Sequence, residues 1–155
     1  MSTYIKPLVL ALLCATSMVI AGENPPSLVD QGNLELSKHH VEKAEALFKQ
    51  AIASDPKSAR AYARLGALYL TTNRSRAAIE PLQQAIMLDP DNPKLFMLMS
   101  IAYIHQAHYS MADAMAKEAQ RLDPDMKNAR KMREYIKAKQ AALATDAPPA
   151  PAKKR

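Results

Sequence analysis

The stretch that decides the fold is residues 59–92, ARAYARLGALYLTTNRSRAAIEPLQQAIMLDPDN. Its large apolar residues recur at helical spacing, at Tyr62, Leu65, Tyr69, Leu82 and Ile86. Small residues at Gly66 and Ala78 allow two antiparallel helices to approach closely. Pro90 has no backbone N–H and therefore ends the second helix. The stretch predicts a pair of packed helices.

The same features return every 34 residues, in five columns of the sequence. Two columns form the Asp-Pro pairs Asp55-Pro56, Asp89-Pro90 and Asp123-Pro124. Two more hold alanines, at Ala44, Ala78 and Ala112, and at Ala51, Ala85 and Ala119. The fifth holds the small residues Gly32, Gly66 and Ser100. Such a period is the signature of a repeat architecture, and it divides the chain into residues 25–58, 59–92 and 93–126, preceded by a short linker at residues 22–26.

These columns resemble the tetratricopeptide repeat (TPR) family, whose pattern the second repeat matches almost throughout. The resemblance covers residues 25–126 and implies an all-α fold, an α-solenoid of three TPR helix pairs plus a C-terminal capping helix. The first repeat departs from the pattern at Gln31 and Glu35, where Leu and Tyr are expected. Terminal repeats of solenoids are often atypical.

The repeat pattern fails after Pro124, where basic residues replace the expected apolar ones. Arg130, Arg133 and Lys137 occupy those positions. One apolar stripe persists, through Met126, Ala129, Met132 and Ile136. Residues 127–143 are therefore expected to form a helix that covers the open end of the stack. Residues 144–155, rich in Ala and Pro and ending in Lys153-Lys154-Arg155, are expected to be a disordered basic tail.

The net charge of +6 is concentrated at this end of the chain. Residues 1–126 contain 12 basic and 13 acidic residues, whereas residues 127–155 contain 9 basic and 2 acidic ones. A basic end attracts acidic partners, anionic lipid or nucleic acid, although it also serves to keep a protein in solution. Binding to a membrane surface or to nucleic acid through the C-terminus is therefore an alternative function, but nucleic acid is not the expected partner.

The N-terminus has the layout of a secretory signal peptide, residues 1–21. Lys6 precedes an apolar run, Leu8 to Ile20, and small residues follow at Ala21 and Gly22. Cleavage after Ala21 would remove Cys14, the single cysteine, and predicts a periplasmic or secreted protein. The alternative is an uncleaved segment that anchors the protein to a membrane.

No pattern of catalytic chemistry is visible in the sequence. The four histidines form two clusters, His39-His40 and His105-x-x-His108, and no Cys or well-placed carboxylate completes a metal site beside either of them. Gly-rich phosphate loops and nucleophile motifs are absent from the sequence. The protein is expected to be no enzyme, with no cofactor and no metal.

The TPR resemblance implies a concave groove lined by the first helix of each repeat. The lining positions fall on Val29, Asp30, Asn33, Leu36, Arg60, Ala63, Arg64, Ala67, Leu70, Lys94, Met97, Leu98, Ile101, Ile104 and His105. The residues expected to bind a partner are Asn33, Arg60, Arg64, Lys94, Met97, Leu98, Ile101 and Ile104. Exposed apolar side chains beside positive charge are typical of a binding site, unless the capping helix covers them. The carboxylate clamp of chaperone-binding TPRs is matched by Asn33 and Lys94 but not by Val29, Arg64 or Leu98.

The expected function is that of an exported scaffold that binds a protein or peptide through this groove. The implied setting is assembly or maturation of envelope, pilus, secretion or cytochrome components. A third possibility is self-assembly, because stacked repeats can associate through their open ends. The sequence names neither the partner nor the pathway.

Overall fold

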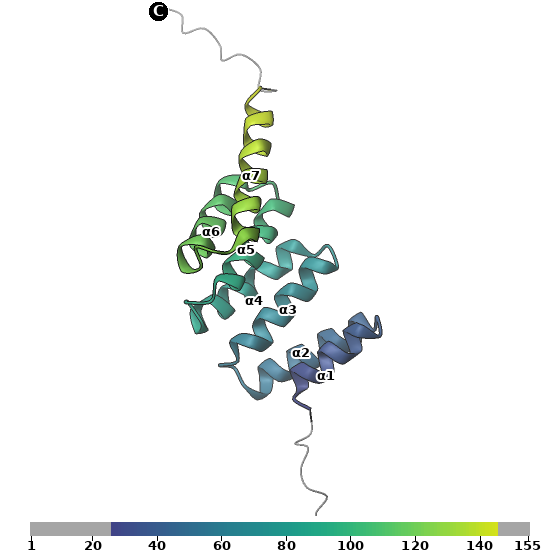
Figure 1. The fold of residues 1–155 in the computed structure, drawn as a ribbon. Helices are drawn as coiled ribbons and strands as arrows, with labels where there is room; N and C mark the ends of the chain where they lie inside the picture. Colours follow the sequence, from purple (N-terminus) through teal and green to yellow (C-terminus); the bar gives the residue numbers. More distant parts are fainter. Residues whose placement is uncertain (1–25, 146–155) are drawn as a thin grey trace, which may run out of the picture.

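The computed structural model describes residues 26–145, which fold into helices without any strand. The helices are α1 (Leu28–Ser37), α2 (Val41–Ser54), α3 (Ala59–Thr71), α4 (Ser75–Leu88), α5 (Pro93–His105), α6 (Tyr109–Leu122) and α7 (Lys127–Thr145). Figure 1 shows α1 to α6 as three successive hairpins, stacked so that each contacts the next. The last helix, α7, packs against α6 and extends past the stack. The all-α solenoid with a terminal helix is confirmed.

The helix ends repeat with the same period as the sequence. Ser58 and Asn92 cap the starts of α3 and α5, where each side-chain oxygen accepts a hydrogen bond from a backbone N–H of the first turn. The Asp of each Asp-Pro pair caps the end of α2, α4 or α6, and its N–H donates to the carbonyl of Ala51, Ala85 or Ala119 at 2.9 Å in all three cases. The Asp-Pro pairs and the alanine column Ala51, Ala85 and Ala119 therefore act together to end the second helix of each hairpin.

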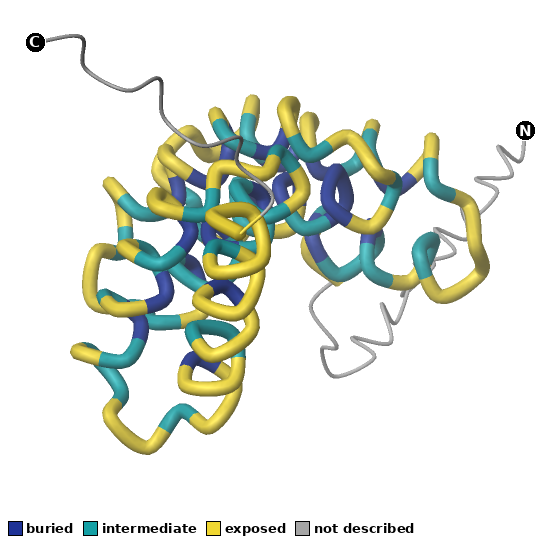
Figure 2. The backbone as a smooth tube through the Cα atoms, turned by 90° about the horizontal axis from the view of Figure 1, so that it is seen from above, coloured by how far each residue is buried: buried dark blue, intermediate teal, exposed yellow. Residues whose placement is uncertain are grey.

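The column of small residues sets the distance between the two helices of each hairpin. A Cβ atom at Gly66 would lie 2.6 Å from Cγ of Leu82, and one at Gly32 would overlap the ring of Phe48. Both Leu82 and Phe48 are fully buried. In the third hairpin Ser100 takes this position, and its hydroxyl donates to the carbonyl of Ala112 at 2.9 Å. Figure 2 shows the resulting core, with buried backbone where helices face one another.

Replacing Gly66 by Ala should destabilise the protein by about 1–3 kcal/mol, because the added methyl group overpacks the contact with Leu82. The same change in an unconstrained helix stabilises by about 0.5–1 kcal/mol, so the sign is diagnostic. Urea unfolding of the single variant measures it. Gly66→Ala should cost less free energy of unfolding in a protein that already carries Leu82→Ala than in the wild type. An equal cost in both proteins would contradict the contact between residues 66 and 82.

The turn inside each hairpin holds one residue in the left-handed conformation. These residues are His39, Asn73 and Ala107, with φ angles of 64°, 59° and 58°. They are again 34 residues apart. Asn tolerates this conformation, whereas Ala has a Cβ that crowds the following carbonyl. The third turn is therefore locally strained.

Ala107→Gly should stabilise the protein by about 1 kcal/mol, because glycine adopts a positive φ without steric cost. The matched control is Ala114→Gly at an exposed position inside α6, which should destabilise by about 0.5–1 kcal/mol. Thermal melting compares the two. A lower melting temperature for both variants would contradict the strain.

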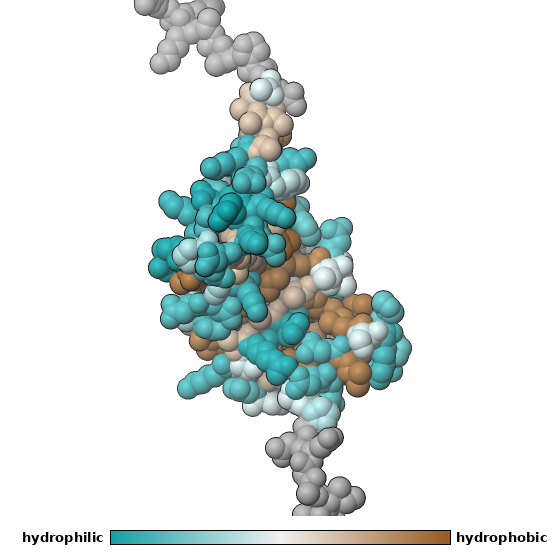
Figure 3. Space-filling view, viewed as in Figure 1, coloured by the Kyte–Doolittle hydropathy of each residue, from teal (hydrophilic) through white to brown (hydrophobic). Residues whose placement is uncertain are grey.

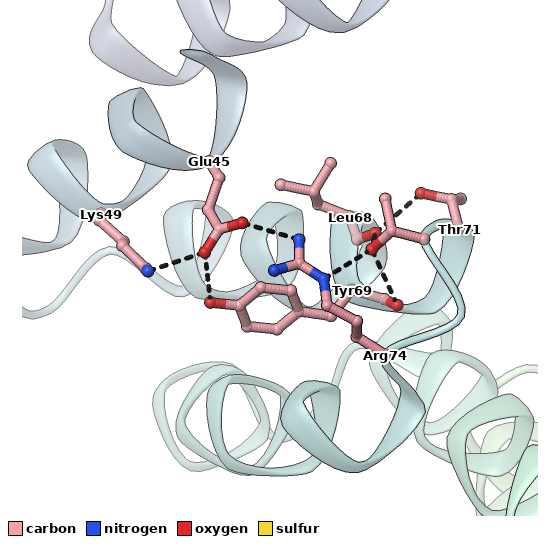
Figure 4. Close-up of polar contacts among 7 residues, drawn as sticks. Glu45, Lys49, Leu68, Tyr69, Thr71 and Arg74 are labelled. Carbon is pink, nitrogen blue, oxygen red and sulfur yellow. Dashed lines mark hydrogen bonds and ion pairs between the residues drawn. The ribbon is translucent and has the colours of Figure 1, made fainter. Parts of the chain in front are cut away.

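A cluster of polar side chains ties the first hairpin to the second (Figure 4). Glu45 of α2 accepts hydrogen bonds from the Tyr69 hydroxyl at 3.0 Å and from the Arg74 guanidinium at 2.7 Å, and Nζ of Lys49 lies 2.7 Å from the same carboxylate. The Arg74 guanidinium also lies 4.5 Å from the centre of the Tyr69 ring. The hydrogen bonds from Lys49 and Arg74 hold the pKa of Glu45 at about 2. Burial, together with the hydrogen bond to Glu45, raises the pKa of Tyr69.

This cluster should make stability depend on pH. Because the pKa of Glu45 is lower in the folded state, its stabilisation is complete above pH 4.5 and is lost as the pH falls toward 2. Glu45→Gln should lower the melting temperature at pH 7 and flatten its fall across that window. Glu35 also has a pKa of about 2, through its hydrogen bonds with His40 and Lys38, so part of the fall should remain.

The control for this prediction is Glu42→Gln, since Glu42 is exposed and forms no ion pair within residues 26–145. Its melting curve against pH should match that of the wild type. A Glu45→Gln curve parallel to the wild type between pH 2 and 4.5 would refute the role of the cluster.

The two ends of the stack differ in how they are finished. At the C-terminal end, α7 covers α6 with Ala129 and Ile136, both fully buried, and Met132 packs beside them. The helix continues through Thr145, so the prediction that residues 144–155 form a disordered tail is wrong for Ala144 and Thr145. The remainder, residues 146–155, and the expected signal peptide, residues 1–21, lie outside the described residues. So do residues 22–25 of the expected linker.

At the N-terminal end no helix among residues 26–145 covers the outer side of α1. Leu34 is 53% exposed, whereas Leu68, its equivalent one repeat later, is 1% exposed. The departures at Gln31 and Glu35 follow from this, because polar residues suit a face that water reaches. Within the part of the chain that the structure describes, no helix is both long and apolar enough to cross a membrane.

Candidate functional site: a groove over α3, α5 and the start of α7

A hollow of the described residues lies on the face formed by the first helices of the second and third hairpins. It has a volume of about 600 Å³. Its lining residues are Ala59, Arg60, Ala63, Arg64, Ala67, Asp89, Asn92, Lys94, Leu95, Met97, Leu98, Ile101, Met126 and Asn128. Figure 3 shows hydrophobic side chains across the middle of this face, with polar side chains on both sides of them.

The groove is lined mainly by apolar side chains, which are small on α3 and large on α5. Ala63 and Ala67 of α3 present only methyl groups, and Met97, Leu98 and Ile101 of α5 stand opposite them, all half-buried. Small residues on one wall and large ones on the other leave space that a ligand's apolar side chains can fill. The burial of such side chains would supply most of the binding energy.

The charged residues of the groove are mainly positive. Arg64 and Lys94 are exposed and form no ion pair within residues 26–145. Arg60 is engaged, because its guanidinium hydrogen-bonds the carboxylate of Asp30 on α1. Hydrogen bonds from Ser27 and then from Arg60 lower the pKa of Asp30, so this pair persists at neutral pH. Two cations therefore remain available to a ligand.

The one carboxylate in the lining is already occupied. Asp89 accepts a hydrogen bond from the side-chain amide of Asn92 at 2.8 Å. The other end of that amide, its oxygen, caps α5 by accepting from the N–H of Lys94 at 3.1 Å. Asp89 and Asn92 thus form part of the groove wall where α5 begins, and Lys94 lies in the first turn of that helix.

Six of the eight predicted binding residues line the groove, namely Arg60, Arg64, Lys94, Met97, Leu98 and Ile101. Two do not. Asn33 lies on α1, which contributes nothing to the lining. Ile104 packs with Tyr103 and Met132 around Ile136, so the capping helix covers it. For this residue the alternative given in the sequence analysis, coverage by the capping helix, therefore holds.

Three further positions of the predicted lining belong to the core. Val29 and Leu70 are 5% and 7% exposed, and Leu36 packs against the same core cluster. Leu70 does not line the groove because the end of α3 is enclosed on all sides. Residues 68–70 are all buried. The expected groove is therefore shorter than the helices that form it.

The structure adds six lining residues that were not among the expected positions, namely Ala59, Asp89, Asn92, Leu95, Met126 and Asn128. The last two lie beyond the repeats' first helices, at and just before the start of α7. Asn128 lies 34 residues after Lys94, in the same column. Extending the repeat register across Pro124 into the capping helix would have found it, although the change from apolar to basic residues at that point breaks the pattern.

The histidine clusters lie away from the groove. His105 and His108 line a separate polar hollow of about 500 Å³ beside the start of α4, with Arg74 and Arg76. His40 instead bonds Glu35, with 2.8 Å between Nδ1 and the carboxylate oxygen. No group of three His, Cys, Asp or Glu residues suited to a metal ion occurs among residues 26–145.

Stacked helical hairpins with a groove across their first helices define a class, the helical repeat proteins that act as scaffolds. The family model of the tetratricopeptide repeat matches residues 29–93. This part of the chain is therefore built from tetratricopeptide repeats. No curated protein is similar enough in sequence to match it.

Solved structures of TPR domains superpose on most of the chain. The second TPR domain of human RPAP3, in complex with the HSP70 peptide SGPTIEEVD, is 26% identical, with a TM-score of 0.69 over 72% of this chain and 92% of that one. The Sgt2 TPR domain from Aspergillus fumigatus is 21% identical, with a TM-score of 0.73 over 84% and 90%. The Yersinia enterocolitica secretion chaperone SycD, in complex with a peptide of the translocator YopD, is 18% identical, with a TM-score of 0.68 over 73% and 92%.

Proposed function

We propose that the protein is a non-catalytic scaffold that binds a segment of a partner protein in the groove over α3 and α5. The observation that carries the proposal is the composition of the groove: an apolar floor of about 600 Å³ with two unpaired cations beside it. A peptide that places apolar side chains on Leu98 and Ile101 and an acidic group near Arg64 would satisfy both parts. The expected ligand is therefore an apolar segment that carries acidic residues.

The structural neighbours support peptide binding as the activity. The RPAP3 domain holds a peptide whose printed sequence, SGPTIEEVD, combines Ile and Val with three acidic residues. The SycD structure also holds a peptide of another protein. The cations of the present groove are placed differently from the clamp expected of chaperone-binding TPRs, since Asn33 lies outside the groove and Leu98 forms part of its floor. We therefore propose a partner other than a chaperone C-terminus.

We further propose that the protein works outside the cytoplasm, in assembly or maturation of envelope, pilus, secretion or cytochrome components. The support is the layout of residues 1–21, with Lys6, the apolar run and Ala21 in signal-peptide order. The intact mass of protein recovered from the cell envelope tests this. A mass that still includes residues 1–21 would favour a membrane anchor.

Reversing the charge at Arg64 should weaken binding of an acidic ligand without lowering stability. Arg64→Glu replaces an exposed cation by an anion and should weaken an acidic, apolar peptide several-fold or more. Deleting residues 146–155 should leave the affinity nearly unchanged at physiological salt, because attraction beyond about 8 Å is screened. Calorimetry on the wild type, Arg64→Glu and the deletion measures both effects.

The same experiment separates the groove from the alternative. If the deletion abolishes binding and Arg64→Glu has no effect, the basic C-terminus is the site and the groove is not. Melting curves of all three proteins serve as the control, since Arg64 is exposed and forms no ion pair within residues 26–145.

A further inference from the structure

The first turn of α7 reaches the groove through Asn128, and helix geometry identifies the flank of α7 that continues from this residue. Ala129 and Ile136 are seven residues apart and fully buried, so they mark the side of α7 that packs on the stack. Asn128, directly before Ala129, lines the groove. Residues spaced seven and eleven positions after Asn128 share its flank, and these are Tyr135 and Lys139.

Two independent observations agree with this placement. Nζ of Lys139 lies 5.6 Å from the centre of the Tyr135 ring, so the two side chains occupy the same flank. In the 34-residue register Tyr135 follows Ala67 and Ile101, and both of those residues line the groove. Tyr135 is 47% exposed, so its ring is accessible to a ligand.

We propose that the peptide site continues onto α7, where Tyr135 and Lys139 bind the acidic end of the same ligand. The proposal rests on the function proposed above and adds the cap helix to the binding surface. Tyr135 would pack against the peptide while Lys139 pairs with one of its carboxylates. The cap helix then has two roles, since it covers α6 with one side and extends the groove with another.

Charge complementarity selects an acidic peptide as the occupant. Residues 127–145 contain six basic residues and a single acidic one, Glu134, and Arg64 and Lys94 carry the same sign along the groove. The C-terminal tail, which ends in Lys153-Lys154-Arg155, has the wrong charge to fill the site itself.

The test uses two synthetic fluorescent peptides of about twelve residues. Both have an apolar centre of Leu, Ile and Met, and the first carries two glutamates at each end where the second carries glutamines. Affinities are measured by fluorescence anisotropy on the full mature chain. The variants are Lys139→Glu, Tyr135→Ala and, as matched control, Lys137→Glu, which makes the same charge change two residues away on the opposite side of the buried stripe.

Lys139→Glu should weaken the acidic peptide three- to tenfold and change the neutral peptide by less than twofold. Lys137→Glu should change neither by more than twofold, and Tyr135→Ala should weaken both peptides several-fold. Melting temperatures should stay within a few degrees of the wild type, because all three residues are exposed.

Three results would overturn the proposal. Equal effects of Lys137→Glu and Lys139→Glu would show attraction by the general charge of α7 and no site. An unchanged affinity in Lys139→Glu and Tyr135→Ala, with Arg64→Glu still weakening the peptide, would confine the ligand to α3 and α5 and leave the proposed function standing. No binding of either peptide to the wild type would refute that function and this extension together.

A fourth measurement, sedimentation over a range of concentrations, excludes a second copy of the chain as occupant if the protein stays monomeric and Tyr135→Ala leaves its size unchanged.

Discussion

The close approach of two helices at Gly32, Gly66 and Ser100 is the constraint on which the rest of the structure depends. A single added methyl group at Gly66 would overlap Leu82, and Leu82 cannot move because it is completely buried. Each hairpin therefore has one allowed spacing. Because small residues hold this position in every hairpin, the hairpins stack on one another, and the first helices of the second and third hairpins line the groove.

The groove is a consequence of what each wall contributes. The second hairpin supplies Ala63 and Ala67, and the third supplies Met97, Leu98 and Ile101. If both walls carried large residues they would meet and close the hollow, and if both carried alanine there would be no apolar surface to bind. The cations lie at the edge of this floor, where water still reaches them and no desolvation cost is incurred before a ligand arrives. The arrangement suits reversible binding of an extended segment more than the conversion of a small substrate.

The two ends of the stack show how a repeat protein avoids open apolar surfaces. The N-terminal end replaces core residues with Gln31 and Glu35, while the C-terminal end adds α7. Leu34 is strongly exposed on the N-terminal face, at 53%. Neither end thus offers a broad apolar surface for unlimited stacking, which weighs against self-assembly through the ends as the main function.

The sequence by itself determined the fold, because a 34-residue period of Asp-Pro, alanine and small residues fixes where each helix ends and how closely it packs. Each hairpin accordingly lies inside one expected repeat: α1 and α2 in residues 25–58, α3 and α4 in 59–92, and α5 and α6 in 93–126. It also indicated most of the groove, since the register of α3 and α5 follows from the same period.

What only the tertiary structure decided is where that groove stops. Val29, Leu70 and Ile104 have the sequence positions of lining residues, but neighbouring helices enclose them. Asn128 has a place in the lining that the basic composition of α7 concealed. Repeat periodicity describes the contacts inside a repeat, whereas the ends of the groove depend on helices that break the pattern, and their placement follows from packing alone.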